Sequence, residues 1–129
     1  MNVPIWLNEN ALRLLHGESL AEFGGLPGIR DEGLLLSALA RPQNLFAYEK
    51  VRNIARLAAA YAYGLAKNHL FNDGNKRVAF LAIGMFLAVN DFKFDVEPTE
   101  TVNTMIALAA GELSELELAE WIEKFIVKA

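Results

Sequence analysis

The chain has 129 residues, a size typical of one domain that buries roughly two thirds of the surface its unfolded chain exposes. Its hydrophobic fraction of 53% predicts a well-filled core, yet no apolar run reaches the ~18 residues expected of a membrane span. A net charge of −4 argues against a direct nucleic-acid binder, which normally carries a basic patch and a high pI. The absence of cysteine excludes a disulfide framework and cysteine-ligated zinc. With no export signal at the start, we expect a cytoplasmic protein with a single domain over residues 1–129.

The first half of the chain predicts two helices separated by a loop. Asn8 is suited to cap the first helix, which Gly24 and the glycine after it should end. The stretch from Gly24 to Gly28 contains proline and three glycines, so it is a loop by composition. Asp31 can cap a short second helix, and Pro42 is expected to end it, because proline lacks the amide hydrogen of a helix interior.

Two longer helices are predicted in the centre. The segment from Val51 to Lys67 has apolar residues at three- and four-residue spacing, and its alanine run allows close helix approach. The segment from Asn75 to Asn90 is apolar on nearly all sides, which predicts a central helix enclosed by its neighbours.

The last third predicts one extended segment and two helices. Residues 92–96 alternate between apolar and polar, as in a strand of a small hairpin or an extended link. A helix ending at Gly111 follows, and Ser114 with Glu117 forms a capping box for the last helix. The predicted fold class is therefore all-α, mainly helical, with at most one short β-hairpin.

The stretch between the two central helices carries most of the chemistry: His69-Leu70-Phe71-Asn72-Asp73-Gly74-Asn75-Lys76-Arg77. If a helix begins at Asn75, its free amide groups and the positive end of its dipole form a ready phosphate site. Gly74 lets the backbone turn tightly and approach a ligand. Lys76 and Arg77 are unfavourable at the positive end of a helix dipole unless an anion offsets their charge. The pattern predicts phosphate binding by Gly74, Asn75, Lys76 and Arg77.

Two further residues in this stretch have suitable chemistry. Asp73 offers a hard carboxylate oxygen, the ligand type that Mg²⁺ prefers beside substrate phosphates. His69 has an ordinary pKa of ~6.5 and is the candidate general base for an attacking hydroxyl. Each residue also has a structural interpretation: a histidine at a helix end can interact with the helix dipole, and Asp-Gly-Asn is a good turn and cap sequence. The combination, rather than any one residue, favours a catalytic site.

This nine-residue stretch resembles the HxFx(D/N)xNKR motif of death-on-curing (Doc) toxins, a branch of the Fic-fold superfamily whose AMP-transferring members carry HxFx(D/E)GNGR. Residues 23–33 and the segment Ala38-Leu39-Ala40-Arg41-Pro42-Gln43 are also similar to the N-terminal region of these toxins. The resemblance therefore covers most of the chain and implies a Fic/Doc-like helical bundle.

Lys76 distinguishes the two branches. In the AMP-transferring branch a glycine leaves room at this position for the α- and β-phosphates of the nucleotide. A long cation fills that space here, and the resemblance to the Doc branch implies a reversed ATP, with the γ-phosphate facing the acceptor hydroxyl. Gly74 stands where the best-known Doc pattern has alanine and matches the AMP-transferring branch instead.

The Doc resemblance implies a toxin of a type II toxin–antitoxin system that moves the ATP γ-phosphate to a serine or threonine hydroxyl of a protein, with elongation factor Tu as the expected target. His69, Asp73 and Arg77 would be the catalytic residues, with Mg²⁺ on Asp73 and ATP as the donor. Translation would be inhibited and growth arrested. Arg30 is a candidate contact to nucleotide or substrate, with a surface ion pair as its structural alternative.

The resemblance also implies an antitoxin whose C-terminal segment folds as a helix in a groove of the toxin. We expect Phe23, Leu26, Leu45 and Phe46 to contribute to that groove, unless they are ordinary core residues. Two alternative functions stay open. One is a Fic-type AMP transferase, favoured by Gly74 and opposed by Lys76, and the other is a non-catalytic module that only binds an anion.

Overall fold

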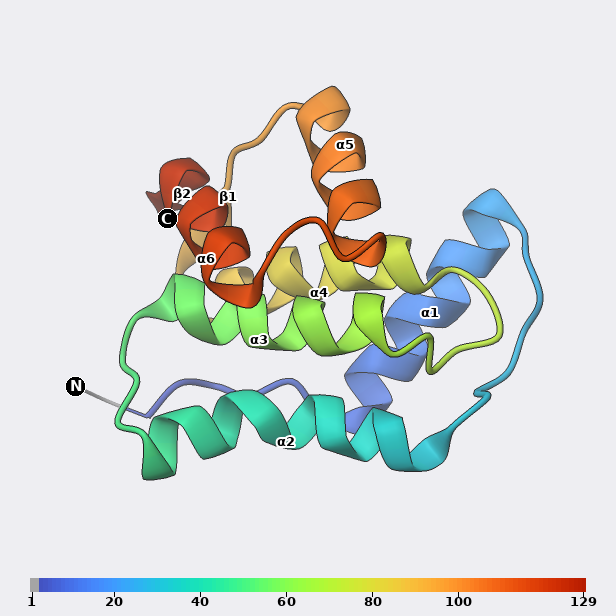
Figure 1. The fold of residues 1–129 in the computed structure, drawn as a ribbon, viewed down its shortest axis with the longest axis horizontal. Helices are drawn as coiled ribbons and strands as arrows, with labels where there is room; N and C mark the ends of the chain where they lie inside the picture. The colour runs from blue at the N-terminus through green and yellow to red at the C-terminus, as the bar shows by residue number, and fades with distance from the viewer. Residues whose placement is uncertain (1–2) are drawn as a thin grey trace.

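The structure, a computed structural model, describes residues 3–129, within which the chain forms six α-helices and two short β-strands. Figure 1 shows their arrangement. In chain order the elements are α1 (Glu9–Phe23), α2 (Glu32–Tyr48), α3 (Ile54–Lys67), α4 (Asn75–Val89), β1 (Phe92–Phe94), α5 (Pro98–Ala109), α6 (Glu115–Phe125) and β2 (Ile126–Lys128). The mainly helical fold class predicted from the sequence is confirmed.

Helix α3 forms the centre of the core. In Figure 1 it lies between α2 on one side and α5 and α6 on the other. Its alanine-rich face is fully buried, and at Gly64 a Cβ atom would lie only 3.2 Å from the Cβ of Ala38 in α2. The small side chains thus let two helices approach closely, as the alanine run predicted. Helix α4 packs along α3 and buries Val78, Ala82, Ile83 and Phe86.

Polar side chains define the beginnings of the helices as the sequence indicated. Asn8 accepts a hydrogen bond from the amide of Ala11, and Asp31 accepts one from Leu34. The capping box of Ser114 and Glu117 is present in both directions. Each bond satisfies an amide that has no partner inside its helix.

The prediction that Pro42 ends the second helix is wrong. Helix α2 continues to Tyr48, six residues further on, with Pro42 buried in its interior. Proline removes one intrahelical hydrogen bond, but burial of Leu39 and Leu45 on the two sides of it favours the continued helix. Here packing against α3 outweighs the local preference of the sequence.

The predicted extended segment is strand β1, and its partner is β2, from the other side of α5 and α6. The strands pair antiparallel, with Phe92 opposite Lys128 and Phe94 opposite Ile126. They are thus joined across two helices and not by a hairpin turn. Among residues 3–129, no helix is both long enough and apolar enough to cross a membrane.

Candidate active site

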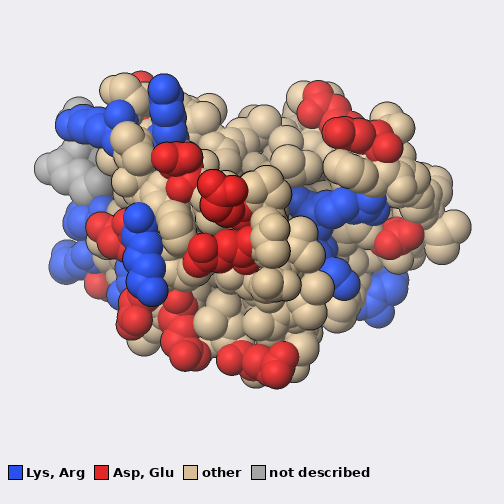
Figure 2. Space-filling view, turned by 90° about the horizontal axis from the view of Figure 1, so that it is seen from above, with Lys and Arg blue, Asp and Glu red and all other residues tan. Residues whose placement is uncertain are grey.

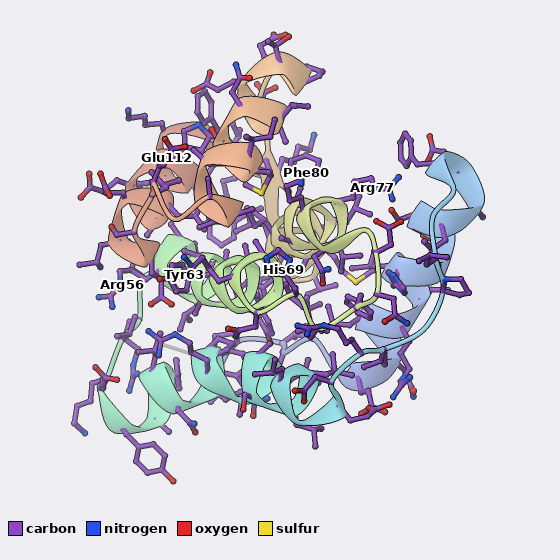
Figure 3. The ribbon with its side chains drawn as sticks, turned by 45° about the vertical axis from the view of Figure 1, so that its right-hand side comes forward. Arg56, Tyr63, His69, Arg77, Phe80 and Glu112 are labelled. Carbon is purple, nitrogen blue, oxygen red and sulfur yellow. The ribbon has the colours of Figure 1, made fainter. Side chains whose placement is uncertain are left out.

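The stretch His69–Arg77, here called the motif loop, joins the end of α3 to the start of α4. The residues that line a hollow of about 440 Å³ are His69 and Asn72 to Arg77, all of them in this loop. Figure 3 shows His69 near the end of α3 and Arg77 beside the start of α4. The fold therefore brings all the predicted phosphate-site residues to one opening.

Gly74 makes the turn into α4. Its φ of 79° and ψ of 16° lie in the left-handed region, which glycine enters without the steric cost of a Cβ. It is the N-cap position of α4, yet no side chain caps the helix there. The first amides of α4 thus face the hollow with the positive end of the helix dipole, the arrangement that favours an anion.

The carboxylate of Asp73 is fixed by two backbone amides. Gly74 donates to Oδ1 over 2.8 Å, and Leu26, from the loop after α1, donates to Oδ2 over 3.2 Å. These bonds, that from Leu26 first, lower the pKa of Asp73 below its ordinary value. The side chain is exposed and ionised at neutral pH.

This carboxylate fits Mg²⁺ by the chemistry of its oxygen donors. Each oxygen has a second lone pair beyond the one used by the backbone amide. Across residues 3–129 no cluster of three or more His, Cys, Asp or Glu side chains could hold a metal. A one-carboxylate site of this kind suits Mg²⁺ that is also bound by substrate phosphates, because Mg²⁺ keeps several waters and needs few protein ligands.

Two cations stand at the start of α4. The Arg77 guanidinium donates to the carbonyl of Gly24 over 3.1 Å and lies 5.2 Å from the ring centre of Phe23. Lys76 is exposed and forms none of the ion pairs found in the described part of the chain. Figure 2 shows basic side chains in a hollow on the right of one face, further basic side chains along its left side, and acidic side chains spread between them.

The Asn75 side chain is engaged with the protein itself. Its Oδ1 accepts from the amide of Phe71 and its Nδ2 donates to the carbonyl of Phe71, both over 3.0 Å. Its amide group therefore holds the motif loop closed, and the role of Asn75 in phosphate binding stays a prediction.

His69 has its own support at the end of α3. It takes a left-handed conformation, φ 48°, which costs energy for a residue with a Cβ. Arg30 donates from Nε to the carbonyl of His69 over 2.8 Å and from Nη2 to that of Asn68 over 3.0 Å. Arg30 thus neutralises carbonyls at the negative end of the α3 dipole. Its contact with nucleotide or substrate stays a prediction.

Comparison with known proteins agrees with this geometry. A model of the Fic/DOC family matches residues 6–87, well over half of the chain and the whole of the motif loop. This chain belongs to the Fic/DOC family. It is similar to the protein kinase doc of Escherichia phage P1, with 30% identity over 118 residues that cover 92% of this chain and 93% of that protein. It is also similar to the toxin Doc of Mycolicibacterium smegmatis, with 36% identity over 99 residues, 73% of this chain and 76% of that protein.

The four residues expected to line an antitoxin groove in this Fic/DOC chain do not form one surface. Leu45 is only 3% exposed and belongs to the core, the alternative that the sequence left open for it. Phe46 is half-buried, with its ring against Trp6 and a guanidinium over its face. Phe23 and Leu26 are 62% and 66% exposed, beside the motif loop. Residue type alone did not show which of these hydrophobic side chains are buried in the core and which are exposed.

One residue at the Fic/DOC site was missed from the sequence. His16, in α1, is buried, and its Nε2 lies 2.8 Å from the backbone oxygen of Asp73. Its ring stacks on Phe71 with 3.9 Å between ring centres. A lone histidine 57 residues before its partner gives no local pattern, so only the tertiary structure places it here.

Proposed function

We propose that this protein is a toxin that transfers the γ-phosphate of ATP to a serine or threonine hydroxyl of a target protein. The observation that carries this proposal is the hollow at the uncapped start of α4, which Lys76, Arg77 and an ionised Asp73 line together with His69. The names of the two relatives, a kinase and a toxin, support the same activity.

Each residue has a distinct task in the proposed reaction. His69 takes the proton of the acceptor hydroxyl, whose oxygen attacks the γ-phosphorus. The bond from the γ-phosphorus to the bridging oxygen breaks, and ADP leaves with that oxygen. The α4 amides, Lys76 and Arg77 stabilise the phosphate charge and align the donor. Asp73 is the residue that would hold Mg²⁺, which when bound neutralises charge on the phosphates.

Lys76 is the residue that favours phosphate transfer over AMP transfer. Its side chain projects at the start of α4, where an AMP-transferring nucleotide needs room for its α- and β-phosphates. The sequence argument for AMP transfer was Gly74, but the left-handed conformation at this position explains glycine by itself. Gly74 therefore no longer distinguishes the two reactions.

The intact mass of purified elongation factor Tu, the proposed target, tests this function after incubation with the protein, ATP and Mg²⁺. We expect a gain of one phosphate, and His69→Ala should slow this gain at least about 100-fold, since general-base catalysis contributes about that much or more. Lys76→Gly is the matched variant for the type of reaction, because it removes the side chain proposed to favour phosphate transfer over AMP transfer. A gain of AMP with the unchanged protein would refute phosphate transfer, and a phosphate gain that survives His69→Ala would refute the role of the base.

We further propose that an antitoxin segment covers Phe23 and Leu26, which are exposed next to the motif loop. Such a segment would bury apolar surface and block the hollow at the same time. Leu26→Glu should weaken binding of the antitoxin, while Leu116→Glu, at a residue 55% exposed on α6, should leave binding unchanged. Equal affinities of the two variants would exclude this surface.

A further inference from the structure

His16 lies against the motif loop at Phe71, Asp73 and Gly74. Its ring lies nearly parallel to that of Phe71, with 17° between the planes. Its Nε2 is 2.8 Å from the carbonyl oxygen of Asp73. At Gly74, an added Cβ would lie 3.8 Å from the same nitrogen. The His16 ring therefore lies beside the segment that contains the candidate metal ligand Asp73 and leads into α4.

The direction of the hydrogen bond is fixed by its acceptor. A carbonyl oxygen only accepts, so Nε2 of His16 carries the proton and donates to Asp73. The histidine is 6% exposed, so little water competes for the bond.

The bond matters because of what the Asp73 backbone controls. The peptide between Asp73 and Gly74 leads into a left-handed residue, where glycine places few restraints on its orientation. Rotation of that peptide would turn the Gly74 amide away from Oδ1, which it holds at 2.8 Å, so the carboxylate could then also leave the amide of Leu26, 3.2 Å from Oδ2. A metal or phosphate ligand displaced by about 1 Å loses much of its effect.

We propose that His16 is a positioning residue, which fixes the Asp73–Gly74 peptide and thereby aims the Asp73 carboxylate at the phosphate site. The contribution of this position to phosphate transfer rests on the proposed function, whereas the positioning itself does not. The alternative is a histidine that only fills the core between α1 and the motif loop.

Two substitutions separate the two properties of the ring. His16→Phe keeps an aromatic ring against Phe71 but removes the donor. His16→Gln removes the ring but keeps an N–H at about the distance of Nε2. The control is Ser19→Ala, one turn further along α1, where a buried hydroxyl has no hydrogen-bond partner in the described structure.

The first measurement is hydrogen exchange of the Leu26 amide by NMR, at a temperature at which each variant is folded. This amide reports directly whether the Asp73 carboxylate is held, and it requires neither ATP nor a target. Loss of one net hydrogen bond predicts exchange faster by roughly three- to tenfold in His16→Phe. In His16→Gln we expect the Leu26 amide to exchange within about twofold of its rate in the unchanged protein. In Ser19→Ala its rate should equal that of the unchanged protein.

The second measurement is the Mg²⁺ concentration that gives half-maximal phosphate transfer. It should rise in His16→Phe by a similar factor, roughly three- to tenfold, and return toward normal in His16→Gln. A core-filling role would instead lower the melting temperature of the variants and leave the Mg²⁺ requirement unchanged.

The outcomes are distinguishable. Unchanged Leu26 exchange in folded His16→Phe, or equally fast exchange in folded His16→Gln, overturns the positioning role. If His16→Phe does not fold, His16→Gln decides the question alone, since protection must persist there. Faster Leu26 exchange in a protein that transfers no phosphate supports the positioning role and rejects the proposed function.

Discussion

The Asn75 side chain offers the most direct test of how the motif loop is held. Asn75→Ala removes both hydrogen bonds to the backbone of Phe71, each 3.0 Å long. Phe71 is 1% exposed, so its amide and carbonyl lose their partners where water has little access. An unsatisfied buried polar group costs about 1–3 kcal/mol, and the lower part of that range suits bonds that are only partly buried. The two groups together predict a loss of about 2–4 kcal/mol.

Urea denaturation of the folded protein measures this loss, and a thermal scan gives it as a lower melting temperature of roughly 6–20 °C at this chain length. The matched control is Asn72→Ala, which removes one exposed bond to the carbonyl of Pro27 and should cost less than about 1 kcal/mol. Asn75→Asp adds a second test, because one carboxylate oxygen would then face the Phe71 carbonyl with no proton between them. Equal stability of Asn75→Ala and Asn72→Ala would refute the argument, as would an Asn75→Asp variant as stable as the unchanged protein.

Two other predictions concern stability and its dependence on pH. Tyr61→Phe leaves the Leu7 amide, 3.0 Å from the phenol oxygen, without its acceptor and should cost about 1–3 kcal/mol in urea denaturation. Burial raises the pKa of Tyr61 from 10.0 to about 12, so its contribution to stability is complete below pH 10 and is lost as pH rises toward 12; Tyr61→Phe should lack this alkaline loss, and an identical alkaline profile would contradict it. The hydrogen bonds of the capping box, that from the Ser114 amide first, lower the pKa of Glu117 below 4.5, so its contribution is present above pH 4.5 and declines as pH falls through the lowered pKa. Ser114→Ala should cost about 1 kcal/mol at neutral pH, and it should reduce this acid dependence only in part, because the Ser114 amide remains; unchanged stability at neutral pH would count against the box.

Local features of the fold could be predicted because they depend on neighbouring residues. Asn8, Asp31 and Ser114 cap helices because a short polar side chain can reach an amide three residues later. Pro42 defeated the same logic, since burial against α3 outweighs one missing hydrogen bond. The pairing of β1 with β2 also escaped prediction, because a three-residue strand carries no information about a partner on the far side of two helices.

Some features of the candidate site could likewise be predicted from the sequence, and others could not. The types and order of residues within the motif loop predicted an anion site at the start of α4, and the structure gathers those residues around one hollow. The contacts of His16 and Arg30 with the loop could not be predicted, because each joins segments that are far apart in the sequence. Exposure was equally inaccessible: Leu26 and Leu45 are the same residue type, yet one lies on the surface and the other in the core.

The motif loop is held by groups outside its own nine residues, so its nine residues alone do not carry its structure into another protein. The loop takes hydrogen bonds or packing from α1 through His16, and from the segment between Gly24 and Arg30 through its backbone and one guanidinium. A graft of His69–Arg77 between two unrelated helices would carry the phosphate-binding residues but leave behind the groups that orient them. Transplanting this chemistry into a new scaffold means moving three separate stretches of chain with their relative positions preserved.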